Sequence, residues 1–449
     1  MDKTVAIYTL GCKVNQCESQ EILDALRRRG WRTAGFGGPA SLYIVNTCTV
    51  TQAADRKSRG IIRGAKKHKP DAMLVVTGCY TENGRAMLDG IRDIDLILTN
   101  RQKEELPELI ENAWIERNAP DISCFSDLPE EGAPRESINR LDRTRAKLKL
   151  QDGCHQFCSY CVIPLVRRER YSMPEEEALA RVARMAEAGY REVVLLGIHL
   201  GAYGWETGEQ DRLAGLYRRL LEAFPAIRFR LGSVEPMEIT ERLLLLIRDY
   251  PNACKHLHLP LQSGCDKILQ AMNRPYSAAA YRDKLCHIRQ HIPDIALTTD
   301  IMTGFPGEGE EEHRQSLAFA GEMAFSLTHV FVYSGRPGTA AAEMPDKVAN
   351  KVKERRSKEF ILLGKTMAER YGSTWVGRVQ QVLMEEEISA GNWLGRSDNY
   401  LEVTFTVPAK SAAEPRWANL RGELLPLKIT GKSLTKAGAW QAVADGYSS

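Results

Sequence analysis

The sequence contains no apolar run approaching the roughly 20 residues that a membrane-spanning helix requires. Its first residues, Met1-Asp2-Lys3-Thr4, lead directly into a segment of strand character, without the basic and apolar pattern of a secretory signal. We therefore predict a cytoplasmic protein. The formal charge of +3, from 61 Lys and Arg against 58 Asp and Glu, is too small to indicate a nucleic-acid partner by itself.

The chain has 449 residues, which exceeds a single ordinary core and predicts two or three domains. It contains eleven cysteines. Because disulfides persist mainly in oxidising compartments, we interpret these cysteines as metal ligands and buried thiols.

Cys154, Cys158 and Cys161 lie on one short loop, separated by three and then two residues. Three thiolates at this spacing hold three corners of a four-iron four-sulfur cluster and leave the fourth iron without a protein ligand. A structural zinc site with His155 as the fourth ligand is the alternative. Zinc sites usually take two ligands from one turn and two from another, so the spacing favours the cluster.

Three further cysteines follow predicted strands in the first part of the chain. Apolar runs at residues 4–10, 41–45, 73–76 and 95–98 alternate with helical patterns, which predicts a parallel sheet covered by helices. Cys12, Cys48 and Cys79 each come just after the carboxyl end of one of these strands, where ligands bind in open α/β sheets. We predict a second cluster site there. Ordinary buried thiols are the alternative.

The remaining cysteines show no paired spacing and stay unassigned. They are Cys17, Cys124, Cys254, Cys265 and Cys286.

The Cys154 loop resembles the cluster loop of the radical S-adenosylmethionine (SAM) superfamily, in which SAM chelates the open iron. The N-terminal cysteine trio, this loop and a β-rich C-terminal segment, in this order, resemble the methylthiotransferase family over nearly the whole chain. Within it, Leu10-Gly11-Cys12-Lys13-Val14-Asn15-Gln16 is similar to the branch acting on threonylcarbamoyladenosine in tRNA, the MtaB type. The isopentenyladenosine enzymes tend to have Gly-Cys-Gln-Met-Asn there, and the ribosomal-protein enzymes Gly-Cys-Pro-Lys-Asn.

The resemblance implies an α/β protein with three parts. Residues 1–120 form a parallel open α/β domain with an auxiliary iron–sulfur cluster, and residues 140–371 form a (β/α)6 partial barrel, the radical SAM core. Strand-like segments at residues 147–151, 192–196, 227–231, 256–259, 296–301 and 328–333 agree with such a barrel. Residues 373–440 resemble a TRAM domain, a small all-β barrel that contacts RNA; a purely structural cap is the alternative.

In parallel barrels the chemistry lies at the carboxyl ends of the strands. Gly197, Glu235, Gln262 and Ser263 occupy such positions and are candidates for binding SAM. Each residue is equally well explained as a helix cap or turn former. Tyr160, between two cluster cysteines, is a candidate for packing on the adenine, with simple loop packing as the alternative.

Two stretches are locally basic, although a solvated surface is the usual explanation of such runs. The first includes Arg56, Lys57, Arg59, Arg63, Lys66, Lys67 and Lys69, and the second Arg135, Arg140, Arg143, Arg145, Lys147 and Lys149. Both are candidates for tracking an RNA backbone. The run at residues 167–173 lacks the glycine that the family commonly has after the cluster loop, and either a phosphate contact or a solvated loop would explain its charge.

The resemblance implies two four-iron four-sulfur clusters and SAM as cofactors. The activity it implies is addition of a methylthio group to carbon 2 of N6-threonylcarbamoyladenosine at tRNA position 37, with an electron donor such as flavodoxin or ferredoxin. Carbon 2 carries no acidic proton for a general base, so radical chemistry is required. Methylthiolation of isopentenyladenosine or of a ribosomal-protein aspartate, and an RNA-binding redox sensor without catalysis, remain the alternatives.

Overall fold

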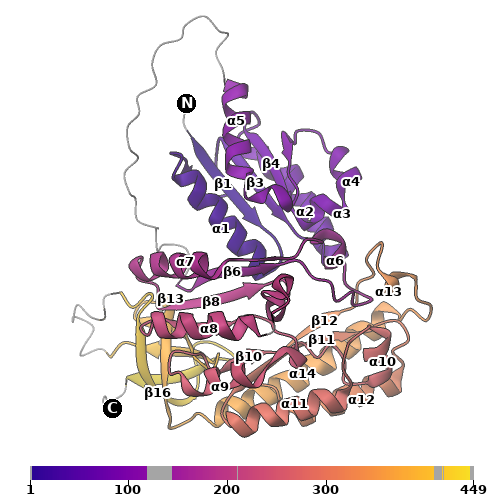
Figure 1. Cartoon of the computed structure of the whole chain (residues 1–449), viewed down its shortest axis with the longest axis vertical. Coiled ribbons are helices and arrows are strands. Elements are labelled where there is room, and N and C mark those ends of the chain that lie inside the picture. The colour runs from indigo at the N-terminus through magenta and orange to yellow at the C-terminus, as the bar shows by residue number, and fades with distance from the viewer. Residues whose placement is uncertain (1–2, 119–143, 210, 409–416, 418, 445–449) are drawn as a thin grey trace, which may run out of the picture. The chain divides into compact units, whose positions relative to one another are not determined.

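The computed structural model describes residues 3–118, 144–209, 211–408, 417 and 419–444 (Figure 1). The chain divides into two compact units. The first unit combines the N-terminal residues with two later segments, Gly153–Glu169 and Ser334–Ala342. The second unit contains the segment ending at Asp152, Arg170–Tyr333 and the chain from Glu343 onward.

The first unit contains a five-stranded parallel sheet in the order β2-β1-β3-β4-β5, which confirms the predicted sheet. Its strands are β1 (Thr4–Thr9), β2 (Arg32–Thr33), β3 (Leu42–Thr47), β4 (Met73–Gly78) and β5 (Leu96–Ile97). The strand β2 has only two residues and was not predicted.

Helices cover both faces of this sheet, because successive side chains of its central strands point to opposite faces. Ile44 packs with α1 and α5 on one face, whereas Val45 packs with α2, the 3-10 helix η1 and α4 on the other. The helices are α1 (Lys13–Arg27), α2 (Gln52–Gly64), η1 (Ala65–His68), α3 (Cys79–Asn83), α4 (Arg85–Asp89), η2 (Arg101–Lys103), α5 (Leu106–Asn118) and α6 (Ile163–Val166).

The second unit contains the six predicted barrel strands, each within two residues of its expected bounds. They are β6 (Ala146–Asp152), β8 (Glu192–Gly197), β9 (Arg228–Leu231), β10 (His256–His258), β11 (Ala296–Thr303) and β12 (Leu327–Val332). Their hydrogen bonding is divided into a β7-β6-β8-β9 sheet, where β7 (Tyr171–Ser172) is antiparallel, and a β10-β11-β12 sheet. A parallel bridge between Ser233 and His258 connects the two sheets.

Helices alternate with these strands and share one large hydrophobic core with them. They are α7 (Glu175–Glu187), α8 (Arg212–Ala223), α9 (Glu241–Asp249), α10 (Asp266–Ala271), α11 (Ala278–His291), α12 (Glu310–Met323) and α14 (Asn350–Ser373). A further short helix, α13 (Ala340–Glu343), begins in the segment Ser334–Ala342 of the first unit. Short 3-10 helices follow β8 and β9 at η3 (Leu200–Ala202), η4 (Trp205–Thr207) and η5 (Pro236–Glu238).

The C-terminal part of the second unit is a closed five-stranded barrel in the order β13-β14-β15-β17-β16. Its strands are β13 (Val379–Ser389), β14 (Asn392–Ser397), β15 (Glu402–Thr406), β16 (Leu424–Lys432) and β17 (Trp440–Ala444). The sequence pattern predicts three of these strands, at residues 374–385, 400–407 and 423–430. The first of them begins later than predicted, because α14 reaches Ser373 and the chain turns at Gly377, whose φ is +86°. The strands β14 and β17 were not predicted.

A buried ion-pair network joins this barrel to the core of the second unit. Glu192 of β8 is fully buried and pairs with Arg228 and Arg230 of β9. The two guanidinium groups also donate hydrogen bonds to four main-chain carbonyl groups of the C-terminal barrel. These belong to Gln381, Arg396, Ser397 and Asp398, at 2.7 to 3.0 Å.

Within the described ranges, no helix is both long enough and apolar enough to cross a membrane.

Candidate functional site

Cys12, Cys48 and Cys79 follow three neighbouring strands of the first unit. Cys12 precedes α1 and is exposed, while Cys48 follows β3 and Cys79 begins α3, and both are buried. Because β1, β3 and β4 are parallel and adjacent, their carboxyl ends lie along one edge of the sheet. The structure therefore brings the three cysteine-bearing loops to the same edge.

Two glycines allow these loops to approach closely. At Gly11 a Cβ atom would lie 2.8 Å from both Cβ and Sγ of Cys48, and at Gly78 it would lie 2.4 Å from the Thr47 carbonyl oxygen. Both glycines have left-handed φ angles, +91° and +102°, which other residues rarely adopt. Glycine at these positions is therefore required by the packing of the loops.

Asn15 connects the loops that carry the cysteines. This buried side chain donates hydrogen bonds to the carbonyl groups of Leu10 and Thr47, each at 2.9 Å. The Thr47 hydroxyl donates to the Thr77 carbonyl at 2.6 Å. Asn15 lies within the motif at residues 10–16, but it was not among the predicted site residues.

The Cys48 thiol is poorly suited to act as a free nucleophile. Burial is the main cause that raises its pKa to about 11, so the reactive thiolate is scarce at neutral pH. Coordination to a metal deprotonates a thiol without regard to its ordinary pKa. The three cysteines of these loops, two of them buried, are therefore suited to ligation.

The Cys154 loop belongs to the same compact unit as the three N-terminal cysteines. Cys158 is buried, Cys154 and Cys161 are half-buried, and the Cys161 amide donates to the Cys158 carbonyl at 2.9 Å to close a turn. Nε2 of His155 lies 2.6 Å from the Arg168 carbonyl oxygen. Since a carbonyl only accepts, Nε2 carries a proton here, which disfavours His155 as a zinc ligand through this nitrogen.

Helix α6, which follows this loop, packs against Cys79 of the other trio. Val162 and Val166 form a small buried cluster with Cys79. Arg167, immediately after α6, points its Nε atom at Cys79 Sγ, 3.5 Å away. The sequence predicted the two trios separately, whereas the structure connects them through this helix.

Arg167 is the centre of a buried polar network. Its guanidinium donates to both carboxylate oxygens of Glu18, at 2.8 and 3.0 Å, and to Asn15 Oδ1 at 3.1 Å. Lys103 also pairs with Glu18, so two cations share this carboxylate. The solvated-loop interpretation of the basic run is therefore wrong for Arg167, although Arg168 beside it is exposed.

The segment Ser334–Ala342 forms hydrogen bonds with both cysteine-bearing regions. Arg336 is buried and donates to Thr49 Oγ1 at 2.7 Å and Asp55 Oδ2 at 2.6 Å, just after Cys48. The Ala341 amide donates to the Ser159 carbonyl at 2.8 Å, inside the Cys154 loop. No local pattern marks Arg336, because its partners lie more than 280 residues earlier in the chain.

The donors and charges of the first unit fit iron–sulfur clusters. Each trio offers three cysteines, and thiolate is the ligand that such clusters take. A cluster held by thiolates places negative charge in a buried site, and the cations Arg167 and Lys103, which both pair with Glu18, lie in the same network as Cys79. Arg167 is therefore suitably charged and placed to compensate a cluster on Cys79.

Four of the five SAM candidates lie in the second unit, and Tyr160 lies in the first, where it is half-buried. Gly197 ends β8, and a Cβ atom there would lie 2.8 Å from the Leu200 Cα atom. This close packing explains the glycine without a ligand, so contact with SAM stays a prediction.

The remaining three candidates follow β9 and β10. Glu235 pairs with Arg274, which also lies 3.5 Å from the Pro260 carbonyl oxygen and so links the loops after these strands. Gln262 has a left-handed φ of +66° and exchanges main-chain hydrogen bonds with β11, while Ser263 is buried. Sequence reasoning missed Arg274, which no recognisable motif marks.

The basic stretches are only partly available to a polyanion. In the first, Arg56, Lys57, Arg63 and Lys67 are exposed, whereas Lys66 pairs with Asp95 at 2.7 Å. In the second, Arg135, Arg140 and Arg143 lie outside the described residues, as does the unassigned Cys124.

Two protein-family models match parts of the chain. Residues 4–99 match "Uncharacterized protein family UPF0004", and residues 148–320 match the "Radical SAM superfamily". The chain is 36% identical to "Threonylcarbamoyladenosine tRNA methylthiotransferase MtaB" of Bacillus subtilis over 409 residues, covering 90% of each protein. The chain belongs to the MtaB-type methylthiotransferases, a radical SAM family.

Other relatives of this methylthiotransferase carry a different substrate in their names. It is 33% identical to a "tRNA-2-methylthio-N(6)-dimethylallyladenosine synthase" of Methylacidiphilum infernorum, covering 95% of this chain and 92% of that one. Among solved structures, the radical SAM methyltransferase TsrM from Kitasatospora setae shares the fold with a TM-score of 0.55 at 13% identity, over 76% of this chain and 74% of that one. As a radical SAM enzyme, the methylthiotransferase uses SAM and a four-iron four-sulfur cluster.

Proposed function

We propose that this methylthiotransferase adds a methylthio group to carbon 2 of N6-threonylcarbamoyladenosine at position 37 of tRNA. The product is 2-methylthio-N6-threonylcarbamoyladenosine. The observation that carries the proposal is the presence of both cysteine trios in one compact unit, where α6 of one loop packs on Cys79 of the other trio. A reaction that combines hydrogen abstraction with sulfur insertion needs both centres near one carbon.

In this proposal Cys154, Cys158 and Cys161 hold the cluster that binds SAM, and Cys12, Cys48 and Cys79 hold an auxiliary cluster. When bound and reduced, the first cluster and SAM supply radical abstraction of an unreactive hydrogen, and the auxiliary cluster supplies the sulfur. Asn15 and the close approach at Gly11 and Gly78 fix the three auxiliary loops. Burial of two of the three cysteines limits the access of water and oxidants.

Arg167 acts as a positioning residue in this arrangement. Its Nε–H is directed at Cys79 Sγ, and its other nitrogens are fixed by Glu18 and Asn15. A guanidinium stays protonated at any physiological pH, so its charge opposes that of a thiolate ligand without titrating. Partners outside the ligand shell commonly set metal affinity and ligand orientation.

We assign SAM binding to residues at the carboxyl ends of the barrel strands, namely Gly197, Glu235, Gln262 and Ser263, and to Tyr160. Arg274 fixes the direction of the Glu235 carboxylate. The C-terminal barrel is proposed to act as a TRAM domain that contacts tRNA, with the exposed cations of α2 as a second contact. An electron donor such as flavodoxin or ferredoxin would reduce the clusters.

The substrate assignment rests on the similarity to the Bacillus subtilis protein and on the motif at residues 10–16. The relative from Methylacidiphilum infernorum favours isopentenyladenosine, also called dimethylallyladenosine, as the second candidate. Anticodon stem-loops carrying threonylcarbamoyladenosine, isopentenyladenosine or plain adenosine separate the two in a reaction with reconstituted enzyme. We expect the methylthio product only from the first, by mass spectrometry of the nucleosides.

Preference for isopentenyladenosine would overturn the substrate assignment. No product from any RNA, while SAM is still cleaved, would point to a protein substrate such as a ribosomal-protein aspartate. Absence of any SAM cleavage by the reconstituted and reduced protein would favour the redox-sensor alternative.

Two triple variants distinguish the roles of the two proposed cluster sites. Replacing Cys154, Cys158 and Cys161 by Ala should remove about half of the iron and abolish SAM cleavage, because alanine offers no ligand. Replacing Cys12, Cys48 and Cys79 by Ala should remove a similar share of iron, keep SAM cleavage and abolish sulfur insertion. Unchanged iron in the second variant would refute the auxiliary site.

A further inference from the structure

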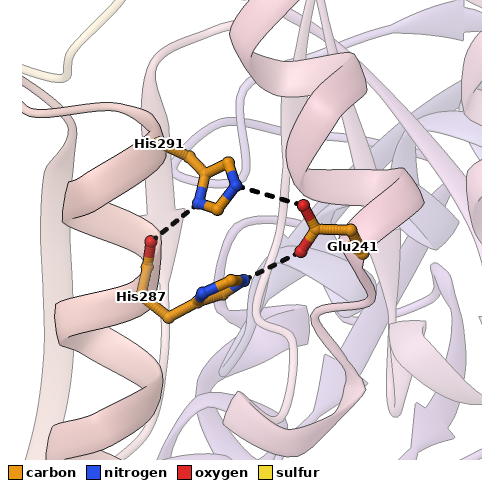
Figure 2. A group of neighbouring side chains, drawn as sticks. All are labelled: Glu241, His287 and His291. Atoms are coloured by element: carbon orange, nitrogen blue, oxygen red, sulfur yellow. Dashed lines mark hydrogen bonds and ion pairs between the residues drawn. The ribbon is translucent and has the colours of Figure 1, made fainter.

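Glu241, His287 and His291 form a cluster of metal-ligand type on two neighbouring helices of the second unit (Figure 2). Glu241 is the first residue of α9, and the two histidines lie one turn apart at the end of α11. One ligand atom from each side chain lies within 4.8 Å of the other two. None of its three residues belongs to the cysteine loops or is one of the strand-end residues described above.

The hydrogen bonds of His291 determine where its proton lies. Its Nδ1 atom is 3.0 Å from the His287 carbonyl oxygen, and a carbonyl only accepts, so Nδ1 carries the hydrogen. Its Nε2 atom faces Glu241 Oε1 at 3.1 Å. In neutral His291 this Nε2 carries a lone pair, which a carboxylate oxygen repels unless a positive charge stands between them.

A second proton or a metal ion would supply that charge. Nε2 of His287 lies 2.8 Å from the other oxygen of Glu241, and the two imidazole rings are 4.5 Å apart. Protonating His291 alone would supply one charge, with His287 donating from Nε2 as a neutral ring, so an ion pair and a metal site are the two arrangements that the test below distinguishes. A single divalent ion would satisfy both nitrogens and both oxygens while the rings stay neutral.

We propose that Glu241, His287 and His291 bind a divalent transition-metal ion of the zinc type through the carboxylate and the two Nε2 atoms. Two histidines and one glutamate are an established zinc ligand set. The His291 Nδ1–H bond to a carbonyl is the partner that metal-binding histidines usually have. Imidazole nitrogens select transition metals over magnesium and calcium, which prefer oxygen.

The ligands are held in place before a metal arrives. Residues four apart on a helix lie on one face, so α11 presents both imidazoles in the same direction. The Thr240 hydroxyl caps α9 by accepting from the Leu243 amide at 3.1 Å, which fixes the start of the helix next to Glu241. Lys284, on the preceding turn of α11, donates to the Ile239 carbonyl at 3.1 Å and holds the two helices together.

The side chains are partly exposed, with 54% of Glu241, 42% of His287 and 24% of His291 accessible. A metal ion can therefore reach the site from solvent, and water can complete its coordination. The ion would join the last turn of α11 to the first turn of α9, so we infer a structural clamp on the outside of the second unit. This clamp goes beyond the proposed methylthiotransferase reaction and takes no part in it.

The test measures zinc on the full-length enzyme with its clusters reconstituted, so that the cluster cysteines are occupied. Wild type and the double variant His287→Gln/His291→Gln are dialysed against buffered micromolar zinc, and zinc and iron are measured in the same sample. We expect one more zinc ion per chain in the wild type than in the double variant, with equal iron. His68→Gln, which removes an exposed histidine of the first unit, should behave as wild type.

A second variant keeps the test decisive if the double variant folds poorly. Glu241→Gln should weaken zinc binding roughly tenfold or more, because the ligand charge is lost. Zinc should raise the thermal unfolding midpoint of the wild type and leave that of Glu241→Gln nearly unchanged. Equal zinc content in wild type and a folded double variant, or unchanged affinity in Glu241→Gln, would overturn the site and leave an ordinary histidine–glutamate ion pair.

Discussion

Each unit contains a buried arginine–glutamate network, and the two networks direct their remaining donors to different partners. In the first unit Arg167 pairs with Glu18 and points at Cys79 Sγ and Asn15. In the second, Arg228 and Arg230 pair with Glu192 and donate to main-chain carbonyl groups of the C-terminal barrel.

The role of a buried arginine–glutamate pair therefore cannot be inferred from the pair alone. A carbonyl group has a fixed dipole, so donors directed at carbonyls join two pieces of structure permanently. A cysteine sulfur changes charge when it binds metal, so a donor directed at sulfur stabilises one state of its partner over another. The partners beyond the ion pair therefore decide whether the network serves architecture or chemistry.

The largest effect is expected from Glu192→Gln, which leaves Arg228 and Arg230 buried without their carboxylate. Breaking a buried pair in this way costs about 3–5 kcal/mol. Unfolding in urea, followed by tryptophan fluorescence, measures it, because Trp375, Trp393, Trp417 and Trp440 lie in the core of the C-terminal barrel. Cluster iron should stay unchanged.

Glu176→Gln is the matched control, since this glutamate pairs with Arg219 at 80% side-chain exposure. It should change the free energy of unfolding by less than about 0.5 kcal/mol. A similar loss of unfolding free energy in both variants would show that the Glu192 network stabilises the protein no more than a surface ion pair does.

Arg167→Gln should instead act on chemistry. We expect a roughly 10–100-fold loss of methylthio product or of retention of the proposed auxiliary cluster, because a partner of one of its proposed ligands, Cys79, is removed. SAM cleavage should persist, and the electron paramagnetic resonance spectrum of the proposed auxiliary cluster, once reduced, should change. Lys103 still pairs with Glu18 in this variant, so the protein should stay folded.

The neighbouring Arg168→Gln is the control, because Arg168 is exposed and its guanidinium donates to the nearby Leu165 carbonyl at 3.0 Å. Equal product and identical spectra in wild type and Arg167→Gln would assign Arg167 to architecture, like Arg228.

A smaller effect is expected from Tyr400→Leu. The Tyr400 ring stacks on His256 at 4.4 Å and lies beneath the guanidinium groups of Arg230 and Arg396, at 5.0 and 4.4 Å. Loss of these ring contacts should destabilise the second unit by about 1–2 kcal/mol. Urea denaturation tests this value, and a loss as large as that of Glu192→Gln would mean that ring packing, rather than the ion pair, fixes the C-terminal barrel.

The smallest effect concerns pH. Burial raises the pKa of Glu192, but Arg228, Arg230 and Arg145 outweigh it, so the net pKa lies well below the ordinary 4.5. A depressed carboxyl pKa contributes stability that is complete above the unfolded-state value and is lost as pH falls toward the folded-state value. The stability difference between wild type and Glu192→Gln should stay constant from pH 7 to 5.5.

Below pH 4.5 the difference should shrink by at most about 1.4 kcal/mol per pH unit. Urea midpoints at successive pH values measure this change. A difference that grows on acidification would contradict the depressed pKa of Glu192.

Much of the architecture could be predicted from local patterns. Apolar segments that alternate with helical ones gave all six barrel strands, and the cysteines after β1, β3 and β4 indicated a common edge. The strand β14 contains Gly395 and Arg396, and β17 is short and alanine-containing, so neither has the β-branched run typical of a strand. Their pairing with neighbouring strands stabilises them.

The supports of the site could not be predicted in the same way. Arg167 and Glu18 are 149 residues apart in the sequence, and Arg336 and Asp55 are 281 apart. No local spacing of residues could therefore predict these pairs. Gly197 shows the opposite problem. The sequence correctly marks a position that needs glycine, but it does not distinguish close packing on Leu200 from room for a ligand.

The first unit is assembled from three pieces of chain, and this has a consequence during synthesis. The segment Ser334–Ala342 emerges from the ribosome long after Cys12, roughly tens of seconds later at typical elongation rates. At first the nascent chain carries its N-terminal cysteines without Arg167. After Arg167 has been made, Arg336 is still missing until Ser334–Ala342 emerges. We therefore expect iron–sulfur insertion into Cys12, Cys48 and Cys79 to occur late. A fragment ending at Asn118 should take up this cluster poorly, because it lacks the later segments of the first unit.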